Sequence, residues 1–166
     1  TYRPISVYAT DINSDGITEL PRAVLMAGYS DAAGSDAIFM IDWYVYSADR
    51  PPVAVATTYE NISDNWRLSI DQAWYDRITA VKTTDSGLSA VAFYEYTGDG
   101  QQIPLFTIYC ATGSTREYYA GRSDLIQLGE STQAVNFARI ADEIQQSTLK
   151  ISEADIRSRF SLVKQD

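Results

Sequence analysis

The residues whose types and spacing could do chemistry lie near the start of the chain, in the stretch YATDINSDGITELPRA. Oxygen-bearing side chains alternate there at Asp11, Asn13 and Asp15, and they are followed by Gly16 and then by Glu19. Calcium is a hard cation that takes carboxylate, amide and carbonyl oxygens as ligands. A glycine permits the left-handed backbone that a tight loop requires. The spacing predicts a calcium-binding loop; the alternative is an Asx-rich turn that binds nothing.

The expected ligand set of this loop combines side chains with one backbone oxygen. The side chains are those of Asp11, Asn13, Asp15 and Glu19, and the backbone oxygen is the carbonyl of Ile17. The apolar side chain of Ile17 would then anchor the loop in the core. The bound Ca²⁺ would be structural, because it links the first segment of the chain to the residues that follow Pro21.

The stretch DINSDGITEL resembles the calcium loop of FG-GAP/VCBS-type extracellular repeats, and its first half is similar to dockerin and EF-hand loops. An EF-hand needs a bidentate acid at its twelfth position, and that position is Arg22 here. Pro21 also opposes an exiting helix in that register. The resemblance therefore implies the shorter loop, with Glu19 as its last ligand.

Catalytic chemistry finds little support elsewhere in the chain. The sequence has no histidine, which excludes histidine triads and histidine-ligated zinc within it. Cys110 lies in the apolar stretch PLFTIYCAT, and we expect a buried, inert core thiol. No spacing pairs two carboxylates as a glycosidase requires, and we expect solvated surface acids at Asp42, Glu60, Asp64, Asp71, Asp76 and Glu95. We therefore expect no enzyme.

The composition is that of a globular domain. The 166 residues are 45% hydrophobic and carry 22 acidic against 13 basic side chains, a formal net charge of −9. Nucleic acid requires a basic patch, and no cluster of Lys and Arg is present, so nucleic acid is not an expected partner. No apolar run is long enough to span a membrane. The chain starts at Thr1 without Met, and we expect a leader, lipid anchor or domain upstream.

Strand signals dominate the first three quarters of the chain. Pro51 and Pro52 separate two of the candidates as a hairpin, and TDSG and GDGQQ mark further turns. Asp71 is the expected N-cap of a short helical turn. Residues 21–29 could form strand or helix, and 30–36 and 113–124 read as connections. The expected strands are 5–9, 37–49, 51–60, 66–70, 78–83, 87–98, 103–112 and 125–130.

Helical spacing appears toward the end of the chain. Residues 131–147, STQAVNFARIADEIQQS, predict one helix, and 152–163 predict a second with Ser152 as its N-cap. The expected fold class is α+β: a mainly antiparallel β-sheet with C-terminal helices packed on one face. We divide the chain into a strand-and-calcium-loop segment at 1–30, which could end an upstream domain, and an α+β domain at 31–166.

A broader resemblance covers residues 59–144. The segments TYENISDNWRLSIDQAWYDRITAV, AVAFYEY, IPLFTIYCAT and LIQLG resemble the layout of cell-surface lipoproteins of gut Clostridia-type bacteria. The spacing from Trp66 to Trp74 also looks like that of the PsbP-like α+β domain, although the proline that this pattern has before the tryptophan is absent, and Gln72 and Ala73 precede Trp74. These resemblances imply a binding or assembly module and carry over no catalytic residue.

Two functions follow as hypotheses. The first is a non-catalytic extracellular domain of a surface-anchored bacterial protein with a structural calcium loop. The alternative is a carbohydrate- or peptide-binding module that uses exposed Tyr and Trp. The expected location is extracellular or at the cell surface, and the expected partner is an unknown protein or glycan. A contiguous patch of exposed aromatic side chains would favour the alternative.

Overall fold

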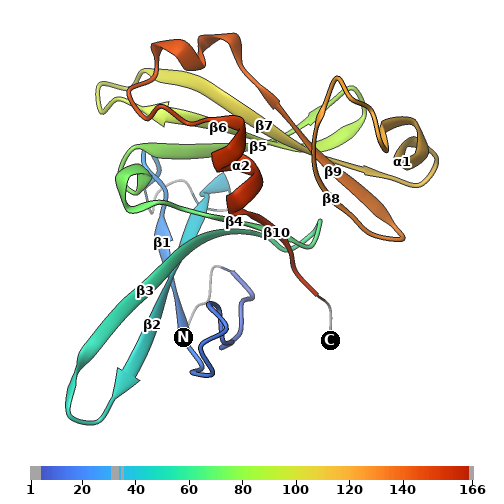
Figure 1. Cartoon of the computed structure of the whole chain (residues 1–166). Coiled ribbons are helices and arrows are strands. Elements are labelled where there is room, and N and C mark those ends of the chain that lie inside the picture. Colours follow the sequence, from blue (N-terminus) through green and yellow to red (C-terminus); the bar gives the residue numbers. More distant parts are fainter. Residues whose placement is uncertain (1–4, 31–33, 35, 165–166) are drawn as a thin grey trace.

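The computed structural model describes residues 5–30, 34 and 36–164 and contains two antiparallel sheets with a few short helices (Figure 1). Strands make up 49% of the described residues and helices 15%, so strand pairing builds the fold. The elements, in which η marks a 3-10 helix, are β1 (Leu20–Leu25), β2 (Phe39–Ser47), β3 (Arg50–Asn61), β4 (Trp66–Ser69), η2 (Gln72–Trp74), β5 (Ile78–Asp85), β6 (Leu88–Tyr96), β7 (Gln102–Thr112), α1 (Ser114–Tyr119), β8 (Ile126–Glu130), β9 (Ala134–Ile140), η3 (Asp142–Gln146), α2 (Glu153–Arg159) and β10 (Phe160–Leu162).

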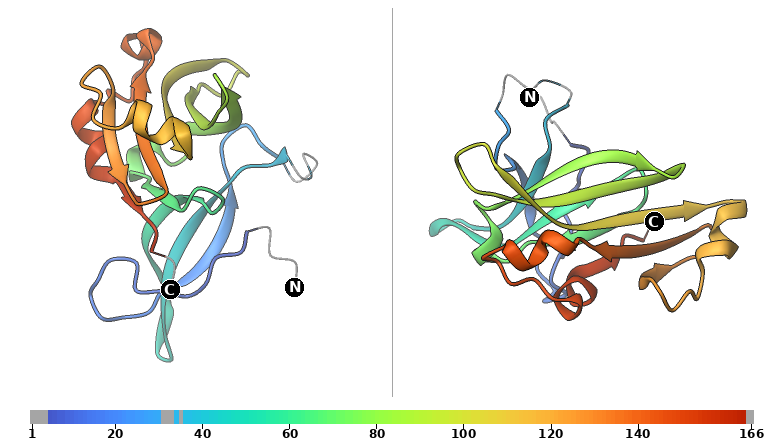
Figure 2. Two further views of the ribbon diagram at one scale, coloured as in Figure 1. Left: turned by 90° about the vertical axis from the view of Figure 1, so that its right-hand side faces the viewer. Right: turned by 90° about the horizontal axis from the view of Figure 1, so that it is seen from above.

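Sheet one has the strand order β1-β2-β3-β4-β10. Its largest unit is the β2–β3 hairpin, which confirms the hairpin expected from the break at Pro51 and Pro52. The hairpin projects beyond the rest of the molecule (Figure 2), and residues 50–55 of β3 are exposed. The other half of β3 is buried because it pairs with β4 over the core.

Sheet two has the strand order β5-β6-β7-β9-β8. The turn between β5 and β6 places Ser86 at φ 52° and Gly87 at φ 78°. Two successive positive φ values belong to the tight hairpin turn whose twist matches the flanking strands. β7 is the middle strand and Cys110 on it is 5% exposed, so the expected central strand and buried thiol are confirmed.

The main hydrophobic core lies between the two sheets. Tyr59 of sheet one touches both Trp66 and Phe93, with ring centroids 5.5 Å apart in each pair. Phe93 stacks in turn on Phe106 at 4.9 Å. Ile156 of α2 is fully buried in the same core. Aromatic packing therefore joins sheet one to sheet two, and α2 closes part of the gap between them.

The prediction of a helix at 131–147 is wrong. Residues Ala134–Ile140 form β9, which pairs with β7 on one side and β8 on the other, and only Asp142–Gln146 form a 3-10 helix. β9 is buried on both faces: Phe137 packs in a second apolar cluster and Ala138 in the main core. A strand buried on both faces has apolar residues without period-two alternation, so its sequence can imitate helical spacing.

The remaining local elements follow the expected pattern only in part. The strand expected at 5–9 is wrong, because that segment has no strand pairing. A helix, α1, stands inside the connection expected at 113–124. Ser152 caps α2 through a capping box with Asp155, as the sequence indicates. Part of the loop expected at 30–36 lies outside the described residues.

β1 pairs with β2 along its whole length, so the first 30 residues contribute a strand to sheet one. The boundary between residues 30 and 31 stays a prediction. The helical part of the C-terminal region amounts to η3 and α2, far less than the two helices expected. Within the described ranges, no helix is long and apolar enough to cross a membrane.

Candidate calcium site

The predicted calcium loop is closed at its neck by one antiparallel bridge. The backbone N–H of Thr10 donates to the carbonyl of Glu19 at 3.1 Å, and the N–H of Glu19 donates to the carbonyl of Thr10 at 2.9 Å. β1 begins at the next residue, Leu20. The bridge therefore ties residues 11–18 directly to the edge strand of sheet one.

The side-chain oxygens of the loop are turned toward its own backbone. Asp11 accepts from the N–H groups of Asp15 at 3.1 Å and Gly16 at 2.9 Å, one through each carboxylate oxygen. Asn13 Oδ1 accepts from Asp15 N–H at 3.1 Å, and Asp15 Oδ1 accepts from Ile17 N–H at 2.8 Å. Gly16 has φ 85°, a conformation that side chains other than hydrogen disfavour. The alternate spacing thus gives a compact turn in which side-chain oxygens accept from backbone N–H groups.

Glu19 is the unusual member of the loop. Its side chain is 0% exposed, and its Oε2 accepts from Ile12 N–H at 2.9 Å. Its Oε1 is buried and has no hydrogen-bond partner within the described part of the chain. A buried carboxylate oxygen without a donor or a cation is strongly unfavourable. A cation or an additional donor at Oε1 would remove that cost.

Two observations count against parts of the predicted ligand arrangement. The side chain of Ile17 is 49% exposed, so the expectation that it anchors the loop in the core is wrong. Among the described residues, no group of three or more His, Cys, Asp or Glu side chains is placed to hold a metal ion. Asp11, Asp15 and Glu19 therefore do not form a ready carboxylate cage. Calcium would draw on amide and carbonyl oxygens as well, with the loop closing around it.

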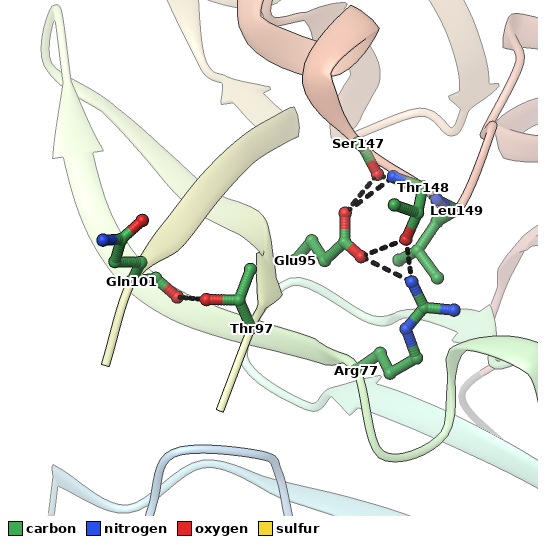
Figure 3. Close-up of polar contacts among 7 residues, drawn as sticks. All are labelled: Arg77, Glu95, Thr97, Gln101, Ser147, Thr148 and Leu149. Carbon is green, nitrogen blue, oxygen red and sulfur yellow. Dashed lines mark hydrogen bonds and ion pairs between the residues drawn. The ribbon is translucent and has the colours of Figure 1, made fainter. Parts of the chain in front are cut away.

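The acids that were expected on the surface include three that are buried: Asp42, Glu60 and Glu95. Glu95 is clamped by the segment after η3 (Figure 3). Its carboxylate accepts from the hydroxyl of Ser147, from the N–H and hydroxyl of Thr148, and from the guanidinium of Arg77. Every donor comes from the protein itself, so this carboxylate fastens β6 to the C-terminal segment.

Asp42 and Glu60 are also occupied by protein donors. Asp42 accepts from Thr57 at 2.8 Å and from the Tyr75 hydroxyl at 2.6 Å, and burial together with that bond raises the pKa of Tyr75. Glu60 accepts from the hydroxyl of Thr58 at 2.7 Å and pairs with Arg67 at 3.0 Å. Burial raises the pKa of Glu60, and those two partners oppose the rise. Asp42 and Glu60 lie inside the expected strands 37–49 and 51–60, and this position in a strand was the signal in the sequence that they could be buried.

Among the described residues, the aromatic side chains do not form the exposed platform that a stacking site needs. All three tryptophans are buried: Trp43 at 0%, Trp66 at 1% and Trp74 at 5% exposure. The strongly exposed tyrosines lie on three different elements, namely the N-terminal segment, β2 and α1; they are Tyr8, Tyr46 and Tyr118. The described residues therefore place no tryptophan on the surface.

Comparison of the chain with protein-family models, with curated proteins and with solved structures found no match. Evidence about function therefore comes from the residues themselves. Within the described part of the chain, the loop at 11–19 contains a buried carboxylate oxygen, Oε1 of Glu19, that lacks a hydrogen-bond partner.

Proposed function

We propose that this protein is a non-catalytic domain of an extracellular, surface-anchored bacterial protein, and that one Ca²⁺ ion bound by residues 11–19 fixes its N-terminal loop to sheet one. The observation that carries the calcium proposal is the buried and unpartnered Oε1 of Glu19. The resemblance of DINSDGITEL to extracellular calcium loops supports the same ion and the same location.

The proposed ligands are the side chains of Asp11, Asn13, Asp15 and Glu19 and the carbonyl of Ile17. Without a cation, the carboxylates repel one another within a short loop. With calcium, the repulsion is replaced by ligation. Because Glu19 immediately precedes β1, the ion would hold the loop to the sheet at the residue where the sheet begins.

The arrangement of the buried acids supports a non-catalytic role. Asp42, Glu60 and Glu95 each accept hydrogen bonds from neighbouring protein groups, as a structural carboxylate does. We propose that the partner of the domain is a protein or a glycan, and that a lipid anchor lies upstream. Biotinylation of intact cells of the source bacterium tests the location; failure to label the protein would remove that part of the proposal.

Thermal unfolding in a calcium series tests the ion. A weak extracellular-type site has a Kd on the order of 10⁻⁴–10⁻³ M. Because the ion binds only the folded state, a tenfold excess over Kd stabilises it by about 1.4 kcal/mol. We expect the melting temperature to rise by a few degrees with calcium and to fall with chelator. Magnesium should substitute poorly, since it demands near-ideal octahedral geometry.

Two variants separate ligation from simple turn structure. Glu19→Gln removes the buried charge but keeps the shape, so it should stabilise the calcium-free protein and abolish the calcium response. Asp15→Ala should abolish the response while leaving the fold intact. Asp49→Ala, at the exposed turn between β2 and β3, is the matched control and should respond as wild type does. If wild type and Asp15→Ala melt identically up to saturating calcium, the loop is only a turn.

A further inference from the structure

An open cavity lined by both polar and apolar groups lies between the two sheets. Its volume is about 360 Å³, within the usual range for small-molecule sites. Its walls come from the β3–β4 turn, from β7, from the β8–β9 turn, from β9, and from the end of β10 with the two residues that follow it. Segments far apart in the sequence thus meet there, and none of residues 11–19 lines the cavity.

The most informative wall residue is Asn136 of β9, which is 0% exposed. Its Nδ2 donates to the carbonyl of Tyr109 at 3.3 Å, while its Oδ1 has no hydrogen-bond partner among the described residues. If the Asn136 amide were flipped, its Oδ1 would face the Tyr109 carbonyl, and two acceptors would oppose each other. The Tyr109 carbonyl therefore fixes Oδ1 as the atom of this amide that remains without a partner. A buried acceptor without a donor is unfavourable, and an ordered molecule that donates to it removes the cost.

The groups around Asn136 favour a neutral ligand rich in hydroxyls. Asp64 adds a carboxylate that is already held in place by Ser89 at 2.7 Å and Asn61 at 3.1 Å. Thr112 and Thr132 bring hydroxyls, which both donate and accept. Burial and the charge of Asp64 raise the pKa of Cys110 to about 11, and a hydrogen bond with the Asn136 side chain opposes the rise, so the thiol in this wall is neutral.

The charges of the lining favour neither an anion nor a cation. Among the described lining residues, Asp64 and Lys164 are the charged ones, and they have opposite signs. An anion would meet the carboxylate of Asp64, and a cation would meet the ammonium of Lys164. Ala134, Leu162 and Val163 supply an apolar wall suited to the C–H face of a sugar ring. A sugar residue has such a C–H face, and its hydroxyls can also donate to the acceptor oxygens of Asn136 and Asp64.

We propose that this intersheet cavity binds one neutral, hexose-sized sugar residue, whose hydroxyls donate to Oδ1 of Asn136 and to Asp64. The site differs from an aromatic stacking platform, because no Phe, Tyr or Trp is among its described lining residues. It extends beyond the calcium proposal and shares no residue with it.

The test is a ¹H–¹⁵N NMR titration of the full chain with glucose, galactose, mannose and N-acetylglucosamine. The methyl glycosides of the same sugars represent a residue linked within a glycan, and glycerol is the control for a non-specific polyol. We expect at least one sugar to cause saturable shifts at the amides of 110–112 and 131–136. A free sugar that binds better than its glycoside would indicate a soluble ligand, and the reverse would indicate the end of a glycan.

Paired variants make the result decisive. Thr112→Val removes one cavity hydroxyl and should weaken sugar binding about fivefold, whereas Thr107→Val, on the same strand but outside the cavity lining, should leave binding unchanged. Asn136→Leu should abolish binding. The proposal is overturned if no sugar gives saturable shifts in the cavity, or if Thr112→Val binds as tightly as wild type.

Each titration is repeated with calcium and with chelator. Because the two sites share no residue, sugar binding with no calcium response would refute only the calcium loop. A calcium response without saturable sugar shifts would refute only the cavity.

Discussion

Replacing Glu95 with Gln is expected to destabilise the fold, because it removes the charge of a buried and fully hydrogen-bonded carboxylate. Glu95 is 3% exposed and accepts from Ser147 Oγ at 2.6 Å, from Thr148 N at 3.0 Å and from Thr148 Oγ1 at 2.6 Å. Arg77 completes the set at 2.6 Å. Gln keeps the size of the side chain but turns an acceptor into a donor at one end, so at least one of these donors loses its partner.

The size of the expected loss in the free energy of unfolding follows from the burial of Glu95 and the exposure of its partners. Hydrogen bonds to charged groups contribute about 1.5–3 kcal/mol each, and breaking a fully buried ion pair costs about 3–5 kcal/mol. The Arg77 side chain is 45% exposed, so solvent screens that part of the interaction. We therefore expect a loss of about 2–4 kcal/mol at neutral pH, a large share of the roughly 5–15 kcal/mol that such a domain has.

The assay is urea unfolding of wild type and variant at matched ionic strength. Glu130→Gln is the control: Glu130 pairs with Arg116 on the surface and its side chain is 59% exposed, so its loss should cost about 0–1 kcal/mol. Ser147→Ala removes a single donor and should cost about 1–2 kcal/mol. An effect of Glu95→Gln no larger than that of Glu130→Gln would refute the assignment of Glu95 as a structural clamp.

The pH dependence gives a second check on the same residue. Burial raises the pKa of Glu95, but the hydrogen bonds from Ser147 and Thr148 and the charge of Arg77 outweigh it, so the net shift is downward. A lowered folded-state pKa stabilises the protein above the unfolded pKa of about 4.3, and that contribution is lost as pH falls through the folded pKa. The difference between wild type and Glu95→Gln should therefore shrink in acid, and a difference constant down to acid unfolding would contradict the assignment.

Three further predictions concern local packing. Cys110 should react slowly with a thiol reagent in the native protein and quickly in denaturant, because burial raises the pKa of its thiol to about 11; rapid native labelling would contradict its burial. Ser152→Ala should cost about 1 kcal/mol in urea unfolding by removing the cap of α2, and Ser158→Ala on the same helix should cost less. Gly129→Ala should cost about 1–3 kcal/mol, since its new methyl group would lie 2.9 Å from the ring of Phe160; an unchanged melting temperature would show that the ring moves aside freely.

Local chemistry in the sequence determined the turns, the caps and the candidate ligand loop. Ser86 and Gly87 adopt positive φ where the TDSG pattern predicts a turn, and Ser152 caps α2 as its side chain favours. The hydrogen bonds that Asp11 and Asn13 accept from the loop backbone follow from their alternate spacing, because these bonds span only a few residues. Such features depend on neighbours along the chain, and a single sequence contains those neighbours.

Contacts between distant segments decided the rest. Residues 134–140 became a strand because β7 and β8 offer backbone partners on both sides, which outweighs the helical spacing of their apolar side chains. Glu95 became a buried clamp because Ser147 and Thr148, more than 50 positions later in the sequence, supply most of its donors. Asn136 lines a cavity that four segments far apart in the sequence form together. Burial and pairing of this kind depend on which segments meet in space, and residue types along the chain do not state that by themselves.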